Sequence, residues 1–143
     1  MTGGAHEERN ATDAAGIERR RPLIALALLL MAVEPLGLAF YASGILTRVV
    51  ERGTWAILLL VIRLAITGIG VGAGLALWYA RPGAIRFARV AIALTVLGVL
   101  LTFLAPVFPH NRPPGTTTPL LAALLVYYGA WFVYLTRLGA RPT

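Results

Sequence analysis

Residues 23–46, LIALALLLMAVEPLGLAFYASGIL, decide the fold of this chain. The stretch is predominantly apolar and carries one charged side chain, Glu34, which lies near its middle and directly precedes Pro35. An α-helix of about 20 apolar residues, with a range of about 17–25, crosses the hydrocarbon core of a bilayer. The stretch therefore predicts a transmembrane helix with a carboxyl group near its centre.

Three more apolar stretches follow, and we expect helices over residues 55–79, 90–108 and 119–136. Their apolar residues are continuous and lack the alternation of barrel strands. The predicted fold class is all-α, with four transmembrane helices in an antiparallel up-down bundle over residues 22–143. Residues 1–21 are polar and of mixed charge, so we expect a disordered cytoplasmic tail there.

The composition excludes several classes of function. The 143 residues are 58% hydrophobic and 13% charged, whereas a soluble domain has about 25% charged residues. Cysteine is absent, which excludes disulfides, thiolate metal sites and cysteine nucleophiles. His6 and His110 have no partner at ligand spacing, so we expect no metal and no cofactor.

The formal net charge of +7 comes from 13 basic residues, all of them arginine. In a soluble protein this charge would suggest nucleic acid. Here the arginines lie in short segments between apolar stretches, so we expect contact with lipid headgroups and no nucleic-acid partner.

Arginine placement also predicts the orientation. Nine arginines lie in the tail, in the connection between the second and third helices and at the C-terminus, and three lie in the other two connections. By the positive-inside rule both termini are cytoplasmic. Arg19–Arg21 followed by residues 23–33 also resembles a secretory signal, but residues 39–44 lack an A-x-A cleavage pattern. We therefore expect an uncleaved first helix.

Glycine, proline and threonine mark the connections between the helices. Gly53-Thr54 suggests an N-cap before Trp55. Arg81-Pro82-Gly83 should end the second helix. The segment 109–119 has four prolines, and Thr118-Pro119 suggests an N-cap followed by proline at the first helical position.

Glu34 and Arg63 are the two charged residues expected inside the bilayer. Together they cost about 5–7 kcal/mol if isolated. Counted at 1.5 Å per residue from the same side of the membrane, Arg63 lies at a depth of about 12 Å and Glu34 at about 18 Å. An extended arginine spans this difference, which suggests a buried ion pair. Two alternatives stay open: Arg63 reaches the headgroups, or Glu34 titrates as a proton or cation site beside a carbonyl that Pro35 frees.

The second helix also contains Gly68, Gly70, Gly72 and Gly74. These glycines form two small-xxx-small pairs, which allow a neighbouring backbone to approach closely, within the chain or between protomers.

Aromatic residues lie toward the helix ends. Trp55, Trp78, Trp131 and Tyr134 are expected to anchor the helices at the two membrane interfaces.

Pro35 within the first helix, the Arg81-Pro82-Gly83 turn and the closing Trp131-Phe132-Val133-Tyr134 before Arg137 together resemble a family of uncharacterised bacterial four-helix inner-membrane proteins that carry a domain of unknown function. The resemblance covers about residues 22–141. The Gly-Trp opening and Ser-x-Arg-Val ending of that family are absent. The resemblance implies a multi-pass protein of the bacterial inner membrane and no known activity.

A second resemblance is to the small multidrug resistance transporters, which are four-helix chains with one glutamate in the first helix. Residues 34–37 (EPLG) and 44–48 (GILTR) are similar to that segment. The resemblance implies that Glu34 exchanges protons for a cation. This chain departs from the pattern because its third helix has only Gly98 and its second helix adds Arg63.

Residue types for catalysis are scarce. Five of the six acidic residues lie outside the expected spans, and Ser43 is the only serine, so we expect no enzymatic activity. The sequence favours an accessory or scaffold module that packs against itself or a larger membrane complex. The alternative is a small proton-coupled transporter that uses Glu34.

Overall fold

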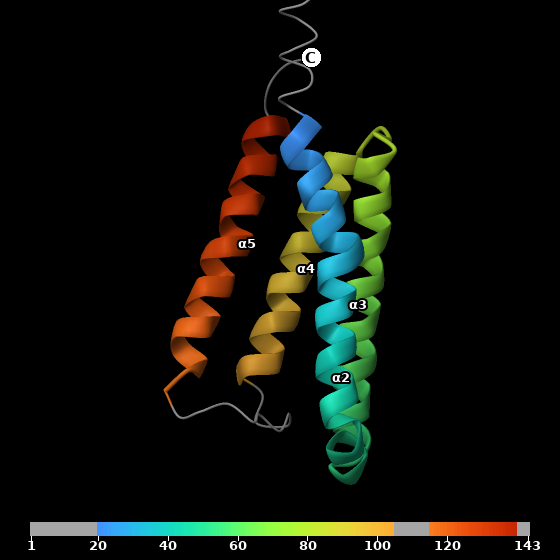
Figure 1. Cartoon of the computed structure of the whole chain (residues 1–143), viewed down its shortest axis with the longest axis vertical. Helices are drawn as coiled ribbons and strands as arrows, with labels where there is room; N and C mark the ends of the chain where they lie inside the picture. The colour runs from blue at the N-terminus through green and yellow to red at the C-terminus, as the bar shows by residue number, and fades with distance from the viewer. Residues whose placement is uncertain (1–19, 105–114, 140–143) are drawn as a thin grey trace, which may run out of the picture.

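The computed structural model describes residues 20–104 and 115–139. Within them the chain is helical with no strand, and four helices are long and apolar enough to cross a membrane. These are the first helix (Arg20–Glu51), α3 (Thr54–Trp78), α4 (Ala84–Leu104) and α5 (Thr117–Gly139) (Figure 1). The all-α class and the four spanning helices are therefore confirmed.

The helix bounds differ from those predicted because hydropathy marks the apolar region rather than the ends of a helix. The first helix includes Arg20 and Arg21, which we had assigned to the tail, and continues beyond Leu46 to Glu51. The third begins at Ala84 instead of residue 90, since its flanking arginines can extend toward the headgroups. Residues 1–19, and residues 105–108 of the third predicted helix, lie outside the described residues.

Turn residues set some of these ends. Gly53, with a φ of 86°, is the N-cap of α3, which begins at Thr54, one residue before the predicted start at Trp55. The helix break at Arg81-Pro82-Gly83 is confirmed, with φ values of 49° at Ala80 and 80° at Gly83. Positive φ favours glycine because a side chain there clashes with the backbone. Thr118-Pro119 lies inside α5, which already begins at Thr117.

The first helix changes its hydrogen-bond register where Pro35 requires it. A π-helical turn, η1 (Leu29–Val33), precedes α2 (Glu34–Glu51). Proline has no N–H, and its ring clashes with the carbonyl four residues earlier, here that of Met31. The Glu34 N–H instead donates to the Leu29 carbonyl, five residues back. The helix therefore accommodates Pro35 by a widened turn that ends at Glu34.

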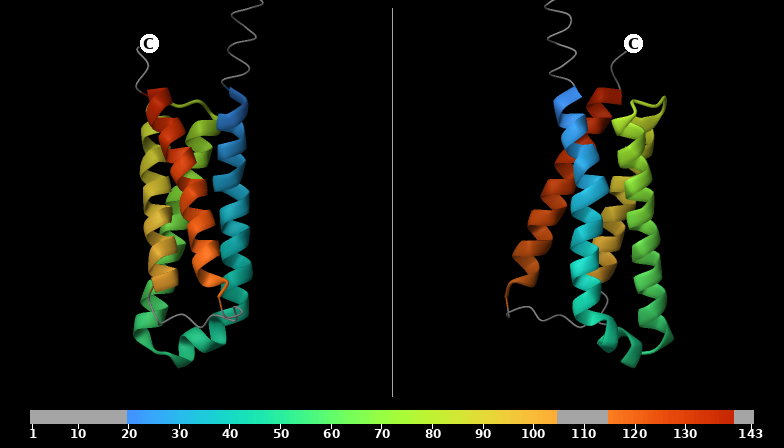
Figure 2. Two further views of the ribbon diagram at one scale, coloured as in Figure 1. Left: turned by 90° about the vertical axis from the view of Figure 1, so that its left-hand side faces the viewer. Right: turned by 45° about the vertical axis from the view of Figure 1, so that its right-hand side comes forward.

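The described helices pack into two separate cores. The larger core draws buried residues from all four helices, including Leu26, Leu77, Ile92 and Leu135. The smaller one, around Val49 and Leu60, involves only α2 and α3. Figures 1 and 2 show α5 leaning away from the first helix toward the end where the hairpin of α2 and α3 extends beyond α4 and α5. α5 makes close backbone contact with α4 but with neither α2 nor α3.

Two of the predicted packing glycines lie against the first helix. A Cβ at Gly74 would meet Met31 Cγ at 2.6 Å and the Ala27 carbonyl oxygen at 2.9 Å, and one at Gly70 would lie 3.9 Å from Leu30. Gly72 lies against Phe87 of α4, whereas a Cβ at Gly68 would meet nothing within 4 Å. Gly70, Gly72 and Gly74 therefore serve packing within the chain.

The difference between these glycines is testable. Gly74→Ala should lower stability in detergent by about 1–3 kcal/mol, the usual cost of overpacking. Gly68→Ala is the matched control and should change stability by less than about 0.5 kcal/mol, as for a surface substitution. Denaturant unfolding followed by circular dichroism measures both values, and equal losses would contradict this packing.

Candidate intramembrane site

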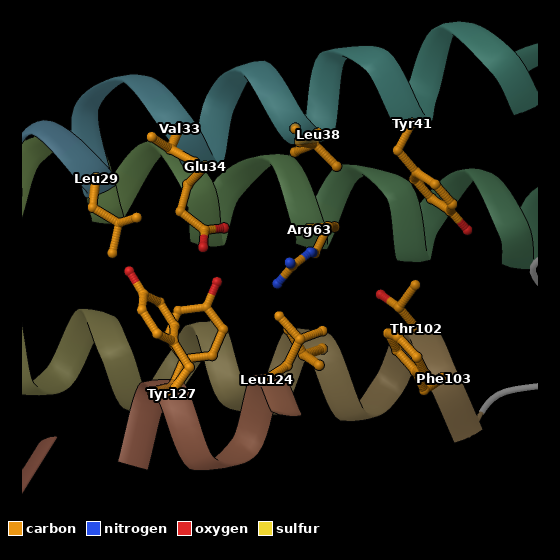
Figure 3. A pocket seen from close by; sticks show the side chains of 13 residues that line it. Leu29, Val33, Glu34, Leu38, Tyr41, Arg63, Thr102, Phe103, Leu124 and Tyr127 are labelled. Carbon is orange, nitrogen blue, oxygen red and sulfur yellow. The ribbon is translucent and has the colours of Figure 1, made fainter. Parts of the chain in front are cut away.

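A cavity of about 420 Å³ lies between the helices, on the side where α5 leans away from the first helix. Its charged, hydroxyl-bearing and aromatic lining residues are Glu34, Tyr41, Arg63, Thr102, Phe103, Tyr127 and Tyr128. Figure 3 shows the Glu34 and Arg63 side chains pointing into the same space from different helices, with Tyr127 facing them from α5. The structure therefore brings the two predicted intramembrane charges to one cavity.

Glu34 is the first residue of α2 and follows the π turn directly. Its side chain is partly buried. Arg63 is close enough for the two charges to interact. Among the described residues, however, no ion pair within 4.0 Å and no side-chain hydrogen bond holds the carboxyl group. The carboxyl group is thus available to a molecule or a proton in the cavity.

Arg63 is held by α4. Its Nη1 donates a hydrogen bond of 3.2 Å to the backbone carbonyl oxygen of Thr95, a residue that is only 4% exposed. The side chain passes α4 at Gly98, where a Cβ would clash with Arg63 Nη1 and lie 3.2 Å from its Cδ. Gly98 therefore provides the passage that lets the guanidinium reach both Thr95 and the cavity.

The predicted direct pair between Glu34 and Arg63 is replaced in this geometry by a shared cavity. Arg63 Nη1 is instead engaged by the Thr95 carbonyl oxygen of α4. The headgroup-directed alternative for Arg63 does not describe this geometry either, because its guanidinium lies between the helices (Figure 3).

The four predicted interface anchors fall into two groups. Trp55 and Trp78, near the ends of α3, are 70% and 49% exposed, as expected for residues at a membrane interface. Trp131 and Tyr134 pack against the larger core, with their ring centroids 5.9 Å apart in an edge-to-face arrangement. These two side chains therefore also contribute to packing within the bundle.

Sequence reasoning missed much of the cavity lining. Tyr127 and Tyr128 lie near the middle of α5 rather than at an end, and this depth was the signal that they are not interface anchors. Thr95, Gly98 and Thr102 recur at helical spacing on α4. That small and polar stripe indicated the face of α4 that approaches Arg63.

The described residues contain no group of three or more His, Cys, Asp or Glu side chains that could hold a metal ion. No family model matches the chain, and no match was found among curated proteins or solved structures. The cavity is therefore the feature of this chain that bears on its function.

Because the Arg63 side chain passes α4 at Gly98, substitutions at these two residues should be energetically coupled. Gly98→Ala should destabilise the protein by about 1–3 kcal/mol, and the loss should shrink in an Arg63→Ala background because the main clash is then removed. The free energy of unfolding in detergent, measured for the wild type, the two single variants and the double variant, gives the coupling energy. Gly129→Ala is the control, since a Cβ there meets nothing within 4 Å. The same loss in both backgrounds would contradict the passage.

Proposed function

We propose that this chain is a small proton-coupled transporter of the bacterial inner membrane, an up-down bundle with both termini in the cytoplasm. The observation that supports this function is the Glu34 carboxyl group, which lines a cavity without a direct ionic partner among the described residues. Ionisable groups inside a membrane mark ion paths and proton relays. Of the two functions expected from sequence, the cavity favours the transporter.

The geometry supplies what such a mechanism needs. Glu34 would bind either a proton or the transported molecule, and competition between them would couple the two fluxes. Arg63 stays fixed to the Thr95 carbonyl and keeps a positive charge at the cavity. α5 has no close backbone contact with α2 or α3, so a movement of α5 relative to these two helices would change access to the cavity.

The second candidate is the accessory module, and the open side of the bundle supports it. The cavity between the first helix and α5 would then be covered by a helix from a second copy or from a larger membrane complex. In that case the cavity would be closed in the assembled state, and neither role would require enzymatic activity.

Reconstitution into liposomes tests the transporter. Vesicles holding a pH-sensitive dye are exposed in turn to choline, glycine betaine and 3,3-dimethylbutyrate, which are a cation, a zwitterion and an anion of similar size. At least one compound should drive proton movement, and Glu34→Gln should reduce that movement by about tenfold or more, because a charge-assisted contact is lost.

Glu51→Gln, at the end of α2, is the matched control and should retain the flux. The transporter would be contradicted by wild-type flux in Glu34→Gln, or by no flux with any of the three compounds. Recovery of a stable complex without any flux would instead favour the accessory module.

A further inference from the structure

From the charges and rings around the cavity, and on the basis of the proposed function, we infer that its ligand is a zwitterion with an alkylated ammonium at one end and an anionic group at the other. Glu34 and Arg63 extend into the same space from two different helices, α2 and α3 (Figure 3), and they form no ion pair with each other within 4.0 Å. A molecule with two opposite charges satisfies both side chains at once.

The balance of charge argues against a simple cation or anion. Within the cavity lining one carboxyl group and one guanidinium are present, so the site has no net charge when both are ionised. A cation is attracted by Glu34 but repelled by Arg63, and an anion is attracted by Arg63 but repelled by Glu34. A dipolar molecule gains from both, and this gain is larger in the low dielectric of the bundle than in water.

The aromatic lining indicates the character of the cationic end. Tyr41, Phe103, Tyr127 and Tyr128 surround the cavity, and Figure 3 shows Tyr127 facing the Glu34 side chain. Aromatic faces attract quaternary ammonium groups through cation–π interactions. The ammonium end therefore lies between Glu34 and the Tyr127 ring.

The anionic end lies toward Arg63. The hydrogen bond to the Thr95 carbonyl uses Nη1, and a guanidinium has five N–H donors, so further donors are present to bind a carboxylate or phosphate. A volume of about 420 Å³ is within the usual range for a small-molecule site.

Two sources supply this chemistry: a soluble zwitterion, or the headgroup of a zwitterionic lipid that reaches the cavity between the first helix and α5. Binding of a zwitterion, a cation and an anion of similar size, measured with the protein in phosphatidylglycerol nanodiscs, shows which type of charge the cavity prefers. Glycine betaine should bind about tenfold or more tightly than choline or 3,3-dimethylbutyrate, because each of the latter lacks one charged contact.

The charge variants should change this preference in opposite directions. Glu34→Gln should weaken binding of glycine betaine and strengthen that of 3,3-dimethylbutyrate, whereas Arg63→Gln should weaken glycine betaine and strengthen choline. Arg63→Lys retains the charge and should keep the preference for the zwitterion even if Arg63→Gln fails to fold. Gly68→Ala, outside the cavity lining, is the control.

Replacing part of the phosphatidylglycerol with phosphatidylcholine then distinguishes the sources. A weaker apparent affinity for glycine betaine identifies a lipid headgroup as the occupant, and an unchanged affinity identifies a soluble zwitterion. Tighter binding of choline or 3,3-dimethylbutyrate than of glycine betaine would overturn the inference. If choline alone drove Glu34-dependent proton movement, the transporter would stand while the zwitterion would be excluded.

Discussion

The structure depends on how this bundle accommodates two charges in a hydrocarbon environment. Isolated charges at that depth are costly, and the two side chains do not neutralise each other by direct contact. Arg63 crosses α4 at Gly98 and bonds to the Thr95 carbonyl, while Glu34 begins the helix that follows the π turn. Both then face one cavity (Figure 3), so the polar groups share a local environment that the surrounding lipid does not offer.

The two cores explain why a cavity exists at that place. Four helices converge around residues such as Leu26 and Leu135, whereas only α2 and α3 meet around Val49. Without a hydrophobic driving force between helices in lipid, close approach depends on small residues and interhelical hydrogen bonds. Gly74 supplies this contact between α3 and the first helix. α5 has no close backbone contact with α2 or α3, and the cavity lies between these helices and α5.

Much of the fold was predictable, since apolar length alone identifies spanning helices, and the distortion at Pro35 follows from its missing N–H. The helix ends were less predictable, because Gly53 and Gly83 act through backbone conformation and not through hydropathy. Glu34 and Arg63 were identified as candidate site residues because a charged side chain inside a membrane has a high free-energy cost. Their geometry was missed, because Arg63 bonds to the backbone of α4, a helix that the count along the first two helices does not include. The roles of Thr95 and Gly98 depend on which face of α4 meets α3, which one sequence does not reveal.

A proton or solute reaches Glu34 only if water enters the cavity, and thiol accessibility in the cysteine-free chain tests this entry most directly. Gly37 lines the cavity and Gly68 does not, and a Cβ meets nothing within 4 Å at either position. In liposomes, a charged methanethiosulfonate should modify Gly37→Cys about tenfold or more faster than Gly68→Cys, because only the thiolate reacts and it forms only in contact with water. Equal rates, or an inert Gly37→Cys, would show that the space beside Glu34 is dry and would contradict the proposed transporter.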